Sequence, residues 1–219
     1  IGHLDVMRYF QKAMRRAEID MCYSEGFSPH MIMSFASPLG LGLESDGEYM
    51  DISVKQSPSS KEAVERLNAV MAEGIEVLSW RELPENSKNA MASVAGADYE
   101  VRFREGYELE EGWKKKLEEF LALPEIRIMK ETKKGEQEVD IRPWVYDYHI
   151  KDQTIFLKVS AGSVHNLKPE LLLKAFGDWA GVEIPAFALL ICRKEMYADE
   201  GSETERKLVA LEELGEEIG

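Results

Sequence analysis

The stretch LDVMRYFQKAMRRA, residues 4–17, determines how the first half of the chain is interpreted. Its apolar residues recur every three or four positions, and neither Pro nor Gly interrupts it, so it predicts an amphipathic helix. The apolar stripe consists of Leu4, Met7, Phe10, Met14 and Ala17. On the side away from this stripe lie four cations, Arg8, Lys12, Arg15 and Arg16. The sequence therefore predicts a helix with one buried face and one basic face.

Outward from this helix, short apolar runs alternate with further helical patterns. Strands are predicted over 31–38, 48–54 and 75–83, with a helix over 59–73. The second half predicts strands over 99–104, 126–131, 139–148, 154–160 and 187–192 and helices over 109–121 and 169–179. This order indicates an α+β fold of two tandem ferredoxin-like (βαββαβ) domains, in which the first strand of domain 1 is missing from the chain and would precede Ile1.

A domain boundary is predicted where Asn, Ser, Ala and Gly accumulate. We expect domain 1 over 1–84, a linker over 85–96, domain 2 over 97–197 and an acidic C-terminal helix or tail over 198–219. The tail holds 8 acidic and 2 basic side chains. The helical spacing of Leu208, Leu211 and Leu214 favours a marginal terminal helix.

The composition is that of a globular protein, with 219 residues of which 44% are hydrophobic and 31% charged. No apolar run approaches the roughly 20 residues of a membrane helix, and no secretion signal is present, so we expect a cytoplasmic protein without membrane association. Cys22 and Cys192 lack any CxxC spacing. Phosphate-loop, dinucleotide and three-cysteine radical SAM patterns are also absent from the sequence, so we expect no cofactor and no metal.

The formal net charge of −14 weakens the case for nucleic-acid binding, because affinity for phosphate comes from Lys and Arg. The tail alone contributes −6 of this charge. A local basic face on the first helix is therefore compatible with the acidic composition, although such charge runs are usually solvated surface.

The densest polar cluster combines the start of the first helix with the loop SEGFSPH, residues 24–30. His3, Glu25 and His30 are candidate catalytic acid–base residues if the loop folds back over the helix. The alternative is structural: Asp5 stabilises the positive end of the helix, and His3 hydrogen-bonds the nearby backbone.

The same loop has a second possible role, in nucleic-acid binding. Phe27 and His30 offer flat faces beside a basic helix, as a platform for single-stranded nucleic acid does. The candidate substrate- or RNA-binding residues are Arg8, Lys12, Arg15, Arg16, Ser24 and Phe27. The alternative places Phe27 in the core and His30 at the start of the strand that begins at Met31.

A second basic cluster lies in the other half and comprises Arg127, Lys130, Lys133, Lys134 and Arg142. Acidic residues are interleaved with these cations along neighbouring predicted strands. This mixture of signs favours cross-strand ion pairs over phosphate binding.

Several longer motifs occur together. They are GHLDVMR (2–8), AMRRA (13–17), YSEGFSPH (23–30), SFASPL (34–39), EYMDI (48–52), TKKG (132–135), VDIRP (139–143) and NLKPE (166–170). In combination they resemble the uncharacterised radical-SAM-linked protein family, a domain of unknown function, over residues 2 to about 197. This chain departs from the family at Gly2, where members commonly have Ser, so a role for that hydroxyl does not carry over.

The resemblance implies a partner, because members are encoded beside or fused to a cobalamin-binding-type radical SAM protein. No activity is established for the family. Our leading hypothesis is a radical-SAM-associated, accessory substrate-binding partner whose substrate is RNA. The alternatives are an RNA-processing or RNA-modifying enzyme that uses His3, Glu25 and His30 as acid–base residues, and a protein-binding scaffold.

Overall fold

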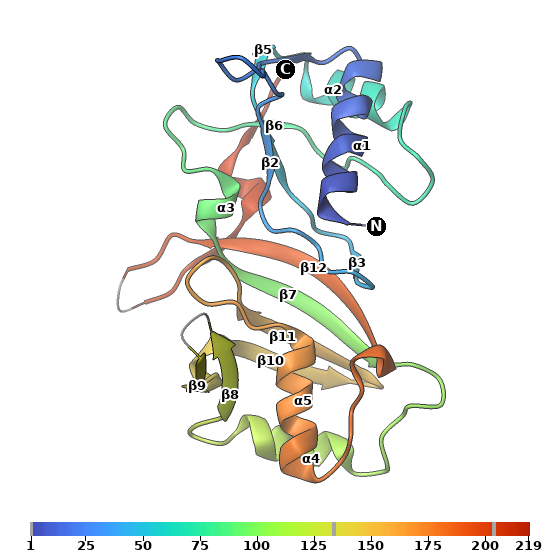
Figure 1. The fold of residues 1–219 in the computed structure, drawn as a ribbon, viewed down its shortest axis with the longest axis vertical. Coiled ribbons are helices and arrows are strands. Elements are labelled where there is room, and N and C mark those ends of the chain that lie inside the picture. The colour runs from blue at the N-terminus through green and yellow to red at the C-terminus, as the bar shows by residue number, and fades with distance from the viewer. Residues whose placement is uncertain (1, 133–134, 203–204) are drawn as a thin grey trace. The chain divides into compact units, whose positions relative to one another are not determined.

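The computed structural model describes residues 2–132, 135–202 and 205–219. The chain divides into two compact units, each built from more than one segment (Figure 1). The first unit comprises Ile1–Leu41, Glu48–Val94 and Tyr197–Gly219, and the second comprises Gly42–Gly47 and Ala95–Met196. The predicted α+β class is confirmed. None of the described helices is long and apolar enough to cross a membrane.

The first unit combines short strands with two main helices. Its helices are α1 (His3–Arg16), α2 (Ser60–Asn68) and α3 (Ala90–Ser93), with a 3₁₀ turn η3 (Leu211–Leu214). Its strands are β1 (Asp20–Met21), β2 (Met33–Phe35), β4 (Met50–Ile52), β5 (Val54–Gln56), β6 (Arg81–Glu82), β13 (Leu208–Ala210) and β14 (Glu216–Glu217). Antiparallel pairs form between β1 and β5, β2 and β4, and β6 and β14.

A methionine-rich core holds the first unit together. Met14 of α1 and Leu67 of α2 are at most 2% exposed and pack in one cluster with Ile19, Met21, Met31 and Met33. Met7 and Phe10 lie against this cluster, as the predicted apolar stripe requires. Leu4 departs from the prediction, because its side chain is 69% exposed and the buried stripe begins one turn later.

The second unit is built on one larger sheet. Its strands are β3 (Glu44–Ser45), β7 (Val94–Phe103), β8 (Arg127–Thr132), β9 (Gly135–Asp140), β10 (Val145–Lys151), β11 (Thr154–Ser160) and β12 (Leu189–Asp199). Its helices are α4 (Trp113–Leu121) and α5 (Pro169–Ala180), with 3₁₀ turns η1 (Arg142–Trp144) and η2 (Ala186–Ala188). The order across the sheet is β10-β11-β7-β12, β3 lies parallel to β12, and β8 and β9 form a separate hairpin.

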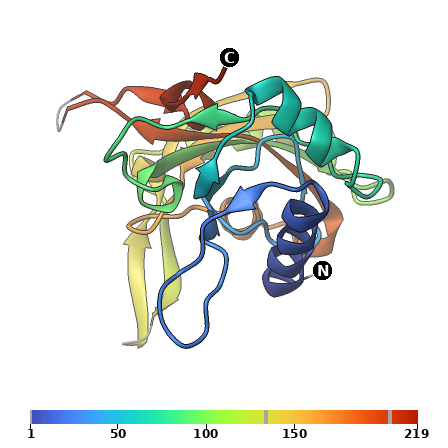
Figure 2. The ribbon, with the colours of Figure 1, turned by 90° about the horizontal axis from the view of Figure 1, so that it is seen from above.

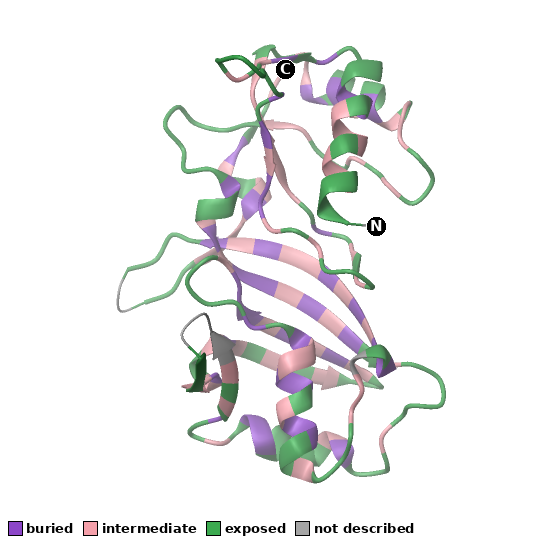
Figure 3. Ribbon diagram, in the orientation of Figure 1, coloured by how far each residue is buried: buried purple, intermediate pink, exposed green. Residues whose placement is uncertain are grey.

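Burial alternates along the central strands of this sheet, as Figure 3 shows. Val101, Ile155 and Leu157 are buried on the face covered by α4 and α5, and these helices contribute Leu117, Leu172 and Phe176 to the core. Because side chains alternate between faces, Glu100, Arg102 and Phe156 lie on the other face. We call this second surface the polar face.

The predicted tandem of ferredoxin-like domains is not evident. Apart from the β8–β9 hairpin, the chain of the second unit passes through β7, α4, β10, β11, α5 and β12. One other strand of the sheet lies between the two strands that each helix connects. In the first unit β13 pairs with the end of β12, and the other strands form separate two-stranded sheets. Its apolar runs supply only two or three paired residues each, which is too little for a continuous sheet of the usual strand length, about 5–6 residues.

Some element boundaries also differ from those predicted. The helix predicted to reach residue 73 ends at Asn68, whose side-chain amide donates to the Val77 carbonyl and accepts from the Val77 N–H. The strand expected over 75–83 is reduced to β6. The expected linker contains α3, which Asn89 caps by accepting a hydrogen bond from the Ala92 N–H.

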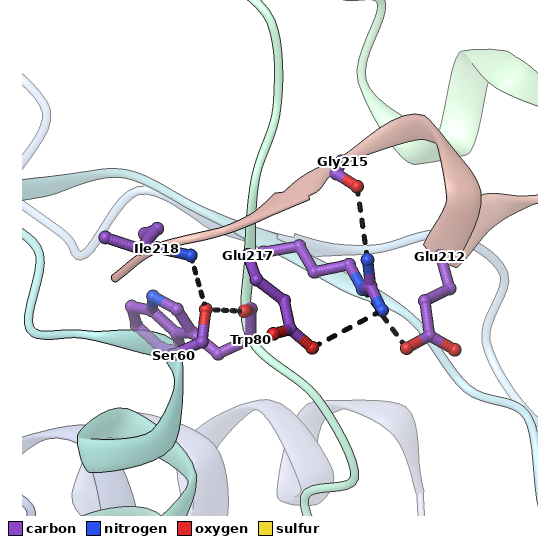
Figure 4. A network of polar contacts seen from close by, with 7 residues as sticks. Ser60, Trp80, Glu212, Gly215, Glu217 and Ile218 are labelled. Carbon is purple, nitrogen blue, oxygen red and sulfur yellow. Dashed lines mark hydrogen bonds and ion pairs between the residues drawn. The ribbon is translucent and has the colours of Figure 1, made fainter.

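The predicted terminal helix is wrong: in the described part of the tail, β13, η3 and β14 replace it. Figure 4 shows how the last residues are held. The Ser60 hydroxyl donates to the Trp80 carbonyl and accepts from the Ile218 N–H, at 2.5 and 2.8 Å. Arg81 binds the Glu212 carboxylate and the Gly215 carbonyl, at 3.1 and 3.4 Å, and lies 3.8 Å from the Glu217 carboxylate. We call these contacts the tail clasp.

Candidate functional site

The exposed face of α1 carries the four predicted cations. Arg8, Lys12, Arg15 and Arg16 are all exposed, while Ala13 and Met14 on the opposite side are buried. Arg8 lies 3.4 Å from the Asp5 carboxylate, and both side chains are largely in solvent, so the pair contributes at most about 1 kcal/mol. Lys12, Arg15 and Arg16 form no ion pair with any residue that the structure describes.

The two arginines at the end of α1 also have a structural role. Arg15 and Arg16 lie in its last turn, where positive charge stabilises the helix dipole. Asp5 lies in the first turn, where negative charge does the same, as expected. Gly2 is the N-cap residue and forms no side-chain hydrogen bond there.

The loop of residues 24–30 closes on itself. Tyr23 and Met31 form an isolated antiparallel bridge at its base, and the Ser24 N–H donates to the His30 carbonyl at 2.9 Å. The Ser24 hydroxyl accepts from the His30 N–H at 3.1 Å and lies 2.8 Å from Nδ1 of the His30 ring. Phe27 is fully exposed in this loop, so the alternative that placed it in the core is wrong.

The structure does not bring all the candidate residues together. Figures 1 and 2 show the loop projecting into solvent and separated from α1 in both views. The His3 ring packs edge-on against Phe35, with the ring centroids 5.6 Å apart. No hydrogen bond or ion pair between described residues links His3, Glu25 and His30 to one another. Ser24 and His30 therefore form one local pair, and His3 lies elsewhere.

One residue of the second basic cluster, Arg127, forms the cross-strand ion pair that the mixed charges predict. Arg127 on β8 lies 2.9 Å from the Glu138 carboxylate on β9 and 2.8 Å from that of Glu125. Lys130 lies over the Trp144 ring, 5.2 Å from its centroid. Arg142 donates to the Val145 carbonyl, and Lys133 and Lys134 lie outside the described residues.

A small cavity, which the sequence does not reveal, lies on the polar face of the second unit. It has a volume of about 120 Å³ and is lined by Gly42, Glu44, Glu100, Arg102, Arg104, Leu190, Ile191 and Cys192. Pockets that enclose a whole small-molecule ligand usually measure about 300–1,000 Å³. This cavity is therefore large enough for one chemical group of a ligand and not for a complete one.

Comparison with known proteins now supplies the family. The family model described as an uncharacterized protein conserved in bacteria, DUF2344, matches residues 1–169. The chain belongs to the DUF2344 family. No curated protein and no solved structure matches it. The description of this family mentions no radical SAM protein. A radical SAM partner of this DUF2344 chain therefore stays a prediction.

Cys192 is the one thiol that lines the cavity of the DUF2344 chain, but it is poorly suited to nucleophilic chemistry. Burial raises the pKa of its thiol above the ordinary value, and the carboxylate of Asp46 adds to the increase. A hydrogen bond to Asp46 in turn raises the pKa of Lys194, which stays charged. Because the thiolate is the reactive form, the raised pKa lowers the reactivity of Cys192 at neutral pH.

The raised pKa of this thiol is testable by alkylation. In a Cys22→Ser background, the rate of iodoacetamide addition to Cys192 is expected to rise only above the pH at which an ordinary thiol ionises. Asp46→Asn removes a charge that raises the pKa, so it shifts the midpoint to lower pH. The midpoint of the plot of alkylation rate against pH is the quantity that reports the pKa of the thiol, because partial burial slows the reaction at every pH and does not move this midpoint. Glu105→Gln is the control, and a wild-type midpoint below that of a free thiol contradicts the argument.

Proposed function

We propose that this DUF2344 protein binds RNA through the exposed face of α1 and acts as an accessory, substrate-binding partner of a radical SAM enzyme. One observation carries the first part of the proposal: three adjacent cations on this face lack acidic partners among the described residues. Elsewhere the chain pairs many of its cations within one helix or hairpin, as with Arg66 and Glu62 or Lys174 and Asp178.

The chain has Asp+Glu 41 against Lys+Arg 27, so acidic side chains are available in excess as partners for its cations. On α1, three cations close together on one helix face are nevertheless without an acidic partner among the described residues. Two acidic residues of the tail, Glu212 and Glu217, are paired with Arg81 in the tail clasp. A cluster that stays unpaired in such a chain supplies the local positive charge that attracts phosphate.

The ligand class follows from the combination of charge with exposed aromatic surface. Successive cations along α1 lie about 6 Å apart along the helix axis when they are four residues apart. Phe27 exposes its whole ring in the same unit, and a ring in water is a surface on which an unpaired base stacks. Single-stranded or looped RNA offers both phosphates and unstacked bases.

The accessory role has two supports. Among the described residues, no hydrogen bond, ion pair or ring contact joins His3, Glu25 and His30, so nothing in the structure unites them in the common site that the acid–base alternative needs. The resemblance to the radical-SAM-linked family points to a radical SAM protein as the partner that performs the chemistry. We also infer that the second unit is a ferredoxin-like domain, on the strength of its βαββαβ path and strand order.

Charge reversal on α1 tests the RNA-binding surface. Arg15→Glu/Arg16→Glu is expected to weaken binding of a labelled single-stranded RNA on the order of 20-fold at 0.1 M salt, because each lost phosphate contact costs about fivefold. The slope of log affinity against log salt should fall by about 0.7 per contact. Lys115→Glu/Lys116→Glu on α4 is the matched control, because both are exposed neighbouring cations and the charge change is equal.

Equal losses in the two double variants would show that net charge, and not this face, controls binding. No RNA binding by the wild-type chain would refute the proposal. Co-purification tests the partner. The tagged chain is purified, with and without ribonuclease, from cells that also make the neighbouring radical SAM protein. Retention of that protein after ribonuclease treatment supports a direct accessory role, and its absence under both conditions contradicts one.

A further inference from the structure

The second unit carries an exposed aromatic pair at one end of its sheet. Tyr107 follows β7 and Phe187 precedes β12, so residues far apart in the sequence meet where these neighbouring strands end and begin. Their rings pack edge to face with centroids 5.4 Å apart. The two residues are 44% and 64% exposed, which leaves much of both rings accessible to a ligand.

Backbone and side-chain hydrogen bonds fix this pair against the sheet. The Arg104 N–H donates to the Ala188 carbonyl, and Nε of Arg104 donates to the Phe187 carbonyl, both at 2.8 Å. The Tyr107 N–H donates to the Arg104 carbonyl at 3.0 Å. The aromatic pair is therefore held in place before any ligand arrives, which reduces the entropy cost of binding.

Cations gather at the same end of the sheet. In the strand register, Lys151 is opposite Thr154, and Thr154 is opposite Arg102, so the two cations share one row across the sheet. Arg104 lies two residues beyond Arg102. Within the described residues, none of these three cations forms an ion pair with a carboxylate.

The cavity of the polar face adjoins these residues, since Arg102 and Arg104 line it. Two carboxylates line it as well. Glu100 lies 3.7 Å from Nζ of Lys194, which offsets its charge, and Glu44 is exposed to solvent. With a volume of about 120 Å³, the cavity accepts a single group, and its arginines favour a phosphate.

We infer that this end of the sheet is a second nucleic-acid contact, at which one base of a single strand stacks on Phe187 while an adjacent phosphate lies against Arg102 and Arg104. The inference rests on the proposed function, from which it takes its ligand class. Its residues, however, belong to the other unit. An acidic peptide would satisfy the arginines and leave the aromatic pair unused. A duplex would keep its bases stacked internally, so a single strand uses both features of the site.

Fluorescence anisotropy with labelled oligonucleotides of about 12 nucleotides tests the site. Phe187→Ala is expected to weaken single-strand binding on the order of 10-fold, because it removes a stacking surface. Binding of a blunt duplex should not change. Val164→Ala is the matched control, since Val164 is an apolar residue of the same unit that is 83% exposed.

Arg102→Gln tests the phosphate contact in the same assay. We expect a loss of about fivefold at 0.1 M salt and a salt slope lower by about 0.7. Lys116→Gln, which neutralises another exposed cation of the same unit, should leave both quantities unchanged. All four substituted side chains lie at the surface, and circular dichroism of each variant verifies that it is folded.

The outcomes separate this inference from the proposed function. If Arg15→Glu/Arg16→Glu weakens binding and Phe187→Ala does not, the inference is overturned and RNA binding by α1 is supported. If only Phe187→Ala and Arg102→Gln weaken binding, the inference is supported and RNA binding by α1 is refuted. The same assay with RNA and with DNA oligonucleotides identifies which nucleic acid binds more tightly. If poly-glutamate competes for the site as well as RNA does, the inference is overturned in favour of an acidic protein ligand.

Discussion

Replacing Phe176 by alanine is expected to lower the free energy of unfolding of the second unit by about 3–5 kcal/mol. The Phe176 side chain is 1% exposed and packs on α4, with its ring centroid 5.7 Å from that of Phe120. Truncation removes the ring and leaves a void between two helices that close packing cannot fill without moving the backbone.

Urea denaturation measures this loss, and hydrogen exchange localises it. Exchange protection should fall in α5 and in the strands that it covers, while α1 and α2 keep theirs. Lys174→Ala on the exposed side of α5 is the control, because its ion pair with Asp178 is largely in solvent and is worth at most about 1 kcal/mol. A loss below about 1 kcal/mol for Phe176→Ala would mean that Phe176 is not a core residue.

Deleting residues 208–219 is expected to destabilise the first unit by about 2–4 kcal/mol, the second-largest effect. The deletion exposes the surface that Leu211, 5% exposed, covers, which is worth about 1.5–3 kcal/mol. It also leaves the buried Ser60 hydroxyl and the Arg81 guanidinium without their tail partners. Four acidic residues are lost as well, and the reduced repulsion opposes the destabilisation.

Thermal unfolding at low and high salt separates these contributions, because salt screens repulsion and leaves burial unaffected. Arg81→Ala is a milder variant that removes the charged half of the tail clasp and should reproduce part of the loss. Glu213→Gln, an exposed substitution in the same segment, should be neutral. An unchanged or higher melting temperature for the deletion at high salt would show that the tail clasp contributes no stability.

Helices and strands with strong local patterns could be predicted from the sequence. The helix over 4–17 is α1 within one residue at each end, the strand over 154–160 is β11, and the helix over 169–179 is α5 within one residue. In each of these segments periodicity, end signals and burial all favour the same structure, so tertiary contacts have nothing to override.

The tail could not be predicted in the same way, because local and long-range preferences conflict. Its leucine spacing fits a helix, but a helix would place Glu212 against Glu216 and Glu213 against Glu217, and like charges four residues apart are destabilising. The edge of β6 offers backbone hydrogen bonds instead. Such a partner lies more than a hundred residues away and leaves no mark in the local sequence.

The candidate sites show the same contrast. The cations of α1 could be predicted because one helix places them on one face. The aromatic pair could not, since Tyr107 follows β7 and Phe187 lies in η2, segments that only the sheet order brings together. The available signal was weak: Tyr107 lies shortly after one predicted strand and Phe187 begins another, and many residues without a role lie at such positions.

The division of the first unit into separate segments also has a consequence for synthesis on the ribosome. Residues 95–196 emerge before Tyr197–Gly219, so the second unit has its complete sequence while the first still lacks β13, β14 and half of the tail clasp. Domains generally fold as units, N-terminal first, as they are translated. Here α1 is translated before the second unit, yet its own unit is completed only by residues translated after the second unit, and nascent chains that lack Tyr197–Gly219 would expose the surface of α2 and β6 to chaperones.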